Sequence, residues 1–162
     1  MAMEQAMTRT IATPGQFLEM VGEILGPSEP VTITQKMIDQ FAEATGDHQW
    51  IHVDVDRASR EMPGGKTIAH GYLTLSLLAG LQNAIYRVEG VGRAINYGAN
   101  KLRLIAPVPV GSQVQLTQTI SGAERIDGGV KVSIDNLFTI VGQERPVLAV
   151  ETIGLFFDEP AA

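Results

Sequence analysis

The sequence predicts an α+β domain in which one long helix is wrapped by an antiparallel sheet, and three observations support this prediction. Helical patterns and polar turns come first, a helix without charged residues follows, and the rest of the chain alternates apolar and polar residues as strands do. Charge is scarce in the middle of the chain, because residues 67–123 contain only five of the 12 basic and 18 acidic residues. A stretch so poor in charge is expected to lie in a core, an interface, or both.

The first half of the chain is predicted to contain a tail, three helices and one strand. Residues 1–12 are expected to form a flexible tail before a single domain at residues 13–162. The helices are expected at residues 13–25, 35–45 and 55–61, and the strand at residues 31–33. Thr13 and Pro14 form a helix-start pattern, whereas Thr34 can cap the second helix and Gly46 can end it.

The second half is predicted to contain the long helix and four strands. The helix covers about residues 70–88, and because it is apolar nearly all round, we expect it to be buried nearly all round. The strands are expected at residues 93–105, 112–120, 130–141 and 147–157, with a hairpin turn at residues 127–129. One apolar face of the last strand is predicted to consist of Val147, Ala149, Ile153, Leu155 and Phe157. One polar, uncharged face that would suit a subunit contact consists of Gln113, Gln115, Thr117 and Thr119.

Composition excludes several classes of protein. The chain has 162 residues, 44% of them apolar, which fits one globular domain and argues against disorder. The absence of cysteine excludes disulfides, thiolate metal sites and a cysteine nucleophile. The net charge of −6 argues against nucleic acid as a partner. Residues 67–86 are uncharged over the length of a membrane span, but their glycine and polar residues favour a buried helix and no membrane. Residues 1–10 lack the pattern of a secretory signal, so we expect a cytoplasmic protein.

Two phosphate-binding patterns are incomplete. Residues 64–67 end like a P-loop, but Arg60 occupies the place of the first glycine. Residues 90–92 begin like a dinucleotide fingerprint, but Ile95 occupies the place of the third glycine. We therefore interpret both as turns.

Residues 45–54 concentrate chemically active side chains, including two of the three histidines and the only tryptophan. Three interpretations stay open on these residues alone. One is a helix end followed by a polar surface loop. A second is a metal site, because His48 and His52 are four residues apart and Asp47 and Asp54 lie beside them. A third is acid–base catalysis, in which Asp47 and His52 face one water and exchange protons near neutral pH.

Gly71 lies at the start of the uncharged helix and also has two interpretations. The glycine would let the end of the helix approach other backbone closely. Alternatively, the free N–H groups of the first helical turn would stabilise a developing oxyanion, and the missing side chain would let a substrate carbonyl approach.

Residues 41–54 (FAEATGDHQWIHVD) and residues 67–71 (TIAHG) together resemble the hydratase motif of MaoC-like (R)-specific enoyl-CoA hydratases. Residues 96–98 (NYG) and 107–111 (PVPVG) match the nodulation-protein-N-like branch of that family. The resemblance covers residues 31–157. Two departures concern the substrate: Gln49 and Trp50 stand where many members have Asn-Pro, and Ala79 replaces a small polar residue of the long helix.

The resemblance implies the hot-dog fold, a homodimer, and the reversible syn addition of water to a trans-2-enoyl thioester, giving the (R)-3-hydroxyacyl thioester. The substrate would be an acyl-CoA, and neither a metal nor a cofactor is implied. By position, Asp47 and His52 would hold the water, and the Gly71 N–H would polarise the thioester carbonyl. The residues expected to bind substrate are Gln49, Trp50, His70, Asn96 and Tyr97.

Three alternatives to an enoyl-CoA hydratase stay open on the sequence. A dehydratase acting on carrier-protein thioesters would use the same residues. A hot-dog thioesterase would release free thiol, and a non-catalytic subunit would bind acyl thioesters without turnover. Candidates for phosphate contacts are the rare cations of the middle region, Arg93, Lys101 and Arg103.

Overall fold

The computed structural model describes residues 8–160, which form one large sheet, one short parallel strand pair, five α-helices and one 3₁₀ helix. In chain order the elements are β1 (Arg9–Ile11), η1 (Pro14–Glu19), β2 (Ile24–Leu25), β3 (Val31–Thr32), α1 (Gln35–Thr45), α2 (Trp50–Val53), α3 (Val55–Glu61), α4 (Gly71–Ser76), α5 (Leu78–Ile85), β4 (Tyr86–Val88), β5 (Val91–Leu104), β6 (Gln113–Ile126), β7 (Gly129–Ile140) and β8 (Leu148–Asp158). The α+β class expected from the sequence is confirmed.

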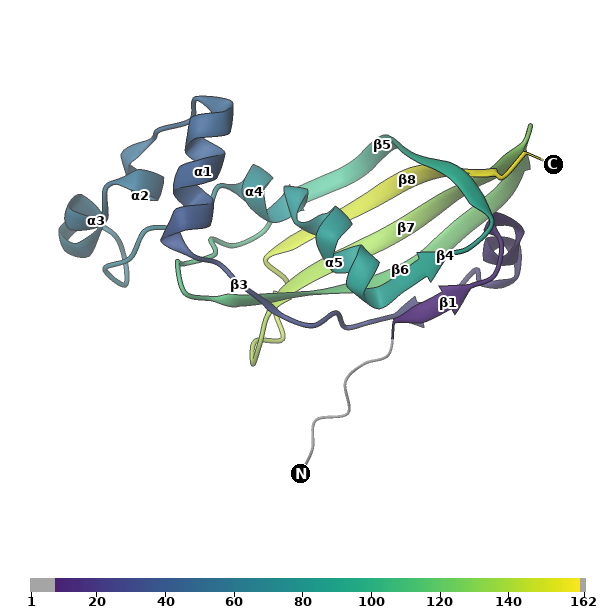
Figure 1. Cartoon of the computed structure of the whole chain (residues 1–162). Coiled ribbons are helices and arrows are strands. Elements are labelled where there is room, and N and C mark those ends of the chain that lie inside the picture. The colour runs from purple at the N-terminus through teal and green to yellow at the C-terminus, as the bar shows by residue number, and fades with distance from the viewer. Residues whose placement is uncertain (1–7, 161–162) are drawn as a thin grey trace.

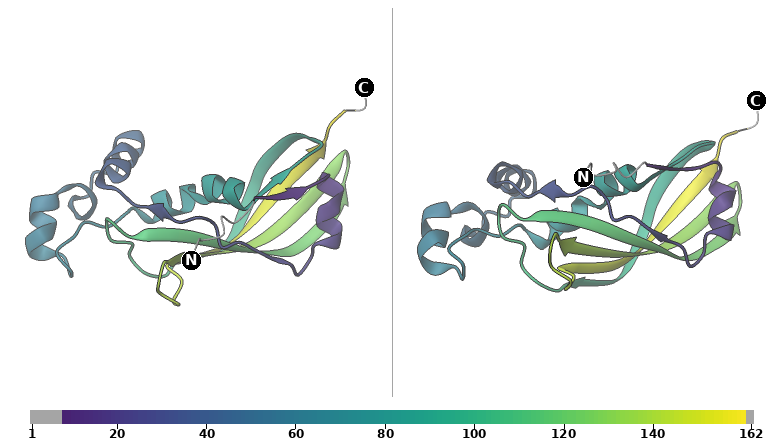
Figure 2. Two further views of the ribbon diagram at one scale, coloured as in Figure 1. Left: turned by 60° about the horizontal axis from the view of Figure 1, so that its bottom comes forward. Right: turned by 90° about the horizontal axis from the view of Figure 1, so that it is seen from below.

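The large sheet is antiparallel and has the strand order β2-β6-β7-β8-β5, with β3 also paired to β6. Helices α4 and α5 lie along one face of this sheet, and α1 to α3 lie together beyond one of its ends (Figure 1). The turned views in Figure 2 show the same separation, with η1 and β1 toward the other end of the sheet. The helices α1 to α3 therefore stand beside the N-terminal end of α4, and it is there that the candidate site forms.

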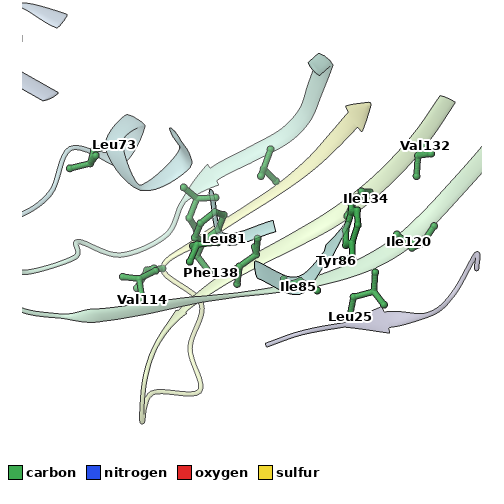
Figure 3. Close-up of a cluster of buried hydrophobic side chains, with 14 of the residues drawn as sticks. Leu25, Leu73, Leu81, Ile85, Tyr86, Val114, Ile120, Val132, Ile134 and Phe138 are labelled. Atoms are coloured by element: carbon green, nitrogen blue, oxygen red, sulfur yellow. The ribbon is translucent and has the colours of Figure 1, made fainter. Parts of the chain in front are cut away.

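The core lies between α4–α5 and the facing side of the sheet. Successive residues of a strand point to opposite faces, so alternate residues reach the helices. The buried side chains of β6 and β7 that do so include Val114, Leu116, Ile120, Val130, Val132, Ile134 and Phe138. Leu73, Leu81 and Ile85 of the two helices belong to the same cluster (Figure 3). No helix within residues 8–160 has the length and apolarity that crossing a membrane requires.

Local signals placed several boundaries correctly. The Thr34 hydroxyl accepts a hydrogen bond from the Met37 N–H (3.2 Å), and α1 ends at Gly46 in the left-handed conformation (φ 77°). The hairpin between β6 and β7 turns at Gly128 (φ 70°), with Ile126 opposite Gly129.

The long helix differs from the expectation of residues 70–88. It consists of α4 and α5, joined at Leu77, and it ends at Ile85 because Tyr86–Val88 becomes extended and pairs with β1. It is also not buried all round: the sheet covers one side, and Tyr72 on the other side is 64% exposed. Absence of charge here therefore marks an exposed, uncharged helix face as well as a core.

The N-terminal expectations were wrong in two places. Arg9–Ile11 forms β1 rather than a tail, because the Ile11 side chain is fully buried and the strand pairs with β4; residues 1–7 lie outside the described residues. The helix expected at residues 13–25 is only the 3₁₀ helix η1, and the Thr13 side chain makes no capping hydrogen bond there. Ile24 and Leu25 instead pair with β6.

The predicted apolar face of the last strand was also wrong. The residues of β8 that are buried are Leu148, Val150 and Phe156, whereas Ala149, Ile153, Leu155 and Phe157 are only partly buried. Both faces of this strand carry apolar residues, so alternation alone could not identify the inner one.

Candidate active site

The candidate site forms where the segment after α1 meets the segment before α4. The Ile68 N–H donates to the Ile51 carbonyl (3.1 Å), which ties the two segments together. This contact brings Asp47, His52 and His70 to one place, where one nitrogen or carboxylate oxygen from each lies within 4.8 Å of the others. The two histidines are buried and Asp47 is exposed.

His52 is held in one ring orientation by its surroundings. It lies in the short helix α2, whose backbone is tied to α1 because the Gln35 amide donates to the His52 carbonyl (2.8 Å). Its Nδ1 lies 2.7 Å from the Ile68 carbonyl oxygen, and a carbonyl can only accept, so Nδ1 carries the hydrogen. Nε2 of the neutral ring is then left with a lone pair. Burial lowers the pKa of His52 below its usual value, which favours this neutral form at neutral pH.

Asp47 follows the left-handed residue that ends α1, so the chain turns sharply just before it. Its carboxylate accepts a long hydrogen bond from the Gln49 N–H (3.3 Å). Its backbone carbonyl accepts a hydrogen bond from Nε2 of His70 (2.9 Å), 23 residues further along the chain. The residue is thus anchored through its backbone, with its carboxylate on the exposed side.

A cavity of about 230 Å³ opens beside His52. Gly71 and Thr74 of α4 line it together with apolar residues at the end of β5, in the segment after it, and around the start of β8: Leu104, Ile105, Ala106, Pro107, Val108, Val147 and Leu148. A Cβ atom added to Gly71 would lie 3.0 Å from Cδ2 of Leu104 and closer still to Cδ1. The absence of a side chain at Gly71 therefore keeps Leu104 close to α4 and the cavity open beside the Gly71 backbone.

The structure does not bring together all residues that the sequence indicated. Gln49 is exposed before α2, and the Trp50 ring is covered by the Arg57 guanidinium, whose carbon lies 4.0 Å from the ring centroid. Asn96 and Tyr97 line a different cavity, of about 410 Å³, between β5 and the helices.

The three candidate cations for phosphate contacts differ in their surroundings. Lys101 lies 3.6 Å from the Glu151 carboxylate, and the Arg93 guanidinium lies over the Phe157 ring. Arg103 is exposed and directly precedes Leu104, which lines the cavity of the candidate site.

The metal ligands considered from the sequence are not gathered as that interpretation requires. His48 is exposed and 3.8 Å from Glu43, and Asp54 caps α3 by accepting from the Arg57 N–H (2.9 Å). His70 takes their place beside Asp47 and His52. One nitrogen of each buried ring already donates to a carbonyl, so only His52 Nε2 and His70 Nδ1 keep lone pairs that could serve an ion.

Sequence reasoning assigned no role to three residues that shape the site. Gln35 and Thr67 join α1 to the segment before α4, because the Thr67 hydroxyl donates to the Gln35 side-chain oxygen (2.6 Å). Leu104 closes the cavity over Gly71. Thr67 belongs to the motif at residues 67–71, but no local signal indicates the role of any of the three, since each acts through a partner distant in the sequence.

Comparison with known proteins identifies the family. The family model described as "MaoC like domain" matches residues 16–140. A 3-hydroxyacyl-thioester dehydratase Z from Mycobacterium tuberculosis is 47% identical over 146 residues, covering 90% of this chain and 96% of that protein. Nodulation protein N from Rhizobium leguminosarum is 37% identical over 146 residues, covering 86% and 88%.

The fold is that of known hydratases. The structure of an (R)-hydratase, PhaJ1 from Pseudomonas aeruginosa, superimposes with a TM-score of 0.69 at 21% identity, covering 86% of this chain and 83% of that one. The long helix against an antiparallel sheet is the hot-dog fold that the sequence resemblance implied. The chain belongs to the MaoC-like dehydratase family, in the branch that includes nodulation protein N.

Proposed function

We propose that this protein is a hydro-lyase that adds water reversibly to trans-2-enoyl thioesters, giving (R)-3-hydroxyacyl thioesters, with acyl-CoA as the substrate. The observation that carries the proposal is a cavity lined by both His52 and Gly71, with a carboxylate oxygen of Asp47 within 4.8 Å of a ring nitrogen of His52. The dehydratase and hydratase names of the compared proteins support the same chemistry.

In the proposed mechanism, one water is held between His52 Nε2 and the Asp47 carboxylate. The water oxygen forms a bond to C3 of the enoyl group while one of its protons passes to the catalytic pair. A proton from the pair enters C2 on the same face, so the pair ends in its starting protonation state. The Gly71 N–H donates to the thioester oxygen, which stabilises the enolate-like charge that develops as C3 is attacked. Dehydration follows the same path backwards.

The second candidate function is a dehydratase for carrier-protein thioesters. The name of the mycobacterial relative specifies a hydroxyacyl thioester without specifying its carrier, which keeps this candidate open. The two differ in what lies outside the cavity, where CoA presents phosphates and a carrier protein presents a surface. Rates with matched CoA and carrier thioesters of one acyl chain decide between them.

The experiment that tests the proposed function compares two neighbouring aspartates. Asp47→Asn should lower the hydration rate of crotonyl-CoA by about 100-fold or more, because the pair loses its charged member. Asp56→Asn is the matched control, since Asp56 is an exposed carboxylate in the first turn of α3, remote from the cavity lining. Loss of enoyl absorbance measures the rate, and chiral analysis identifies the product. Wild-type turnover in Asp47→Asn, or release of free thiol instead of hydration, would contradict the proposal.

We also propose that the protein is a homodimer whose copies meet along β5. This strand lies at the edge of the sheet with β8 as its one neighbour, and it is exposed along most of its 14 residues, including Ile95 (43%) and Tyr97 (65%). A long, exposed edge strand leaves N–H and C=O groups that can pair with another chain. A second copy of β5 would fill the unpaired edge and continue the sheet.

Sedimentation tests the position of the dimer contact. We expect Tyr97→Glu to convert the dimer to a monomer, whereas Gln115→Glu, on the uncharged face that the sequence indicated, should leave it intact. The reverse result would move the contact to that face of β6, and a monomeric wild type would contradict the dimer itself.

A further inference from the structure

His70 is buried in the site, yet it does not line the cavity. Its exposed fraction is 3%, and the cavity beside it is lined by its neighbours Ala69 and Gly71 instead. Its Nε2 lies 2.9 Å from the Asp47 carbonyl oxygen, so this nitrogen donates a hydrogen bond to the Asp47 backbone. The expectation from the sequence that His70 binds substrate does not explain this arrangement.

The two buried histidines form a reciprocal pair. His52 belongs to the segment after α1 and donates from Nδ1 to the carbonyl of Ile68, in the segment before α4. His70 belongs to the segment before α4 and donates from Nε2 to the carbonyl of Asp47, in the segment after α1. The rings stack with their centroids 3.8 Å apart and their planes 24° apart, and the Phe41 ring lies 5.0 Å from that of His70.

We propose that His70 is a positioning residue of the active site, which fixes the Asp47 loop through its Nε2–H and holds the His52 ring by stacking against it. This inference rests on the proposed function for its catalytic meaning. Among the described residues, the other hydrogen bonds of Asp47 are long and local: its N–H to the Thr45 hydroxyl (3.4 Å), and the Gln49 N–H to its carboxylate (3.3 Å). His70 is therefore the long-range anchor that keeps the exposed Asp47 beside His52.

His70 also acts on the proton equilibrium of His52. Burial is the main cause of the lowered pKa of His52, the Ile68 hydrogen bond and the Asp47 charge oppose it, and the neighbouring His70 ring adds to it. The side chain of α1 that contacts the His52 backbone is Gln35, which is uncharged.

Two substitutions separate the hydrogen bond from the ring. His70→Gln keeps an amide N–H at about the reach of Nε2, whereas His70→Phe keeps an aromatic ring against His52 and Phe41 but cannot donate. We expect His70→Phe to lower kcat by about 10- to 100-fold, since a misplaced catalytic group can cost about 100-fold, with little change in KM. His70→Gln should recover most of that loss.

His48→Gln is the matched control, because His48 lies in the same segment but is exposed and paired with Glu43 rather than with the site. It should leave kcat and the pH profile unchanged. The inference is overturned if His70→Phe keeps the wild-type kcat, or if His70→Gln loses as much activity as His70→Phe.

A measurement without turnover keeps the inference separate from the proposed function. The chain has three histidines, so ¹⁵N-correlated NMR spectra of the wild type contain three imidazoles, and His48→Gln identifies one of them. We expect the hydrogen on Nδ1 of His52 and on Nε2 of His70. The opposite tautomer at His70 would overturn the inference even in an active enzyme. The expected tautomers together with no hydration of any enoyl thioester would leave His70 as the anchor of the Asp47 loop and refute the proposed function alone.

Discussion

Replacing His52 by asparagine should remove catalysis while sparing the fold. The amide nitrogen of asparagine occupies about the position of Nδ1 of histidine, so it can keep the hydrogen bond to the Ile68 carbonyl (2.7 Å). Nothing in asparagine replaces Nε2. His52→Ala, in contrast, removes both nitrogens and leaves the part-buried Ile68 carbonyl without its partner. The two variants therefore separate the chemical role of the ring from its structural role.

The magnitudes follow from these contacts. A positioned general acid or base contributes about 100- to 10,000-fold to the rate, so both variants should lose that factor in kcat, or about 2.7–5.5 kcal/mol of barrier lowering. An unsatisfied buried polar group costs about 1–3 kcal/mol, and His52 is only 6% exposed. His52→Ala should therefore lower the free energy of unfolding by about that amount, and His52→Asn by less than about 1 kcal/mol.

Two assays on the same preparations check this prediction. Loss of enoyl-thioester absorbance gives kcat, and urea denaturation followed by circular dichroism gives the free energy of unfolding. Equal destabilisation by the two variants would show that the Ile68 hydrogen bond is not what holds the ring. Turnover within tenfold of wild type in His52→Asn would show that Nε2 is not the catalytic atom, and the mechanism would have to be abandoned.

Three further predictions concern the cavity, the core and pH. Gly71→Ala should lower kcat/KM by at least about tenfold with little loss of stability. The reason is that the added Cβ displaces the flexible, half-exposed Leu104 side chain toward the position of the reacting carbonyl. An unchanged kcat/KM in steady-state assays would refute this. Asn136→Ala should lower the free energy of unfolding, measured in urea, by about 2–4 kcal/mol, because the buried amide donates to the Ile134 and Val150 carbonyls (2.9 and 3.1 Å). A loss below about 1 kcal/mol would contradict this prediction. The wild type should lose stability as the pH falls below about 6.5. The pKa of His52 is lower in the folded than in the unfolded chain, so in this pH range the unfolded chain binds a proton at His52 more readily. The loss should stop once the pH is below the folded-state pKa. His52→Asn should flatten that part of the stability profile in urea titrations at several pH values, and an equal slope would assign the loss to other groups.

Elements with local signals were predictable. The helix α1 lies between a capping threonine and a left-handed glycine, and the β6–β7 hairpin turns at an Asp-Gly sequence, so each boundary depends on a few adjacent residues. The buried residues alternate along β6 as far as Ile120 and along β7 after Gly129, which identifies the inner face directly. Strand β8 is apolar on both faces, and there the same rule selected the outer face.

The candidate site was predictable in composition but not in arrangement. Asp47 and His52 lie within ten residues that contain several titratable side chains, and the family resemblance assigned their roles. The sequence grouped His70 with Asn96 and Tyr97 as substrate contacts. In the structure, His70 faces Asp47, and the other two lie on β5 at a separate cavity. Residue type alone does not reveal these differences.

The sequence by itself determined the α+β class and the bounds of elements with local signals, such as α1 and β7, and it supplied Asp47 and His52 as a hypothesis for the catalytic pair. Tertiary structure decided which imidazole nitrogen keeps its lone pair, which carbonyl holds each ring, and which side of the long helix is covered. The physical reason is the range of the interactions. Caps and strand alternation act over a few residues, whereas the hydrogen bonds that orient His52 and His70 join residues 16 and 23 positions apart. Their geometry exists only once the sheet and helices have packed.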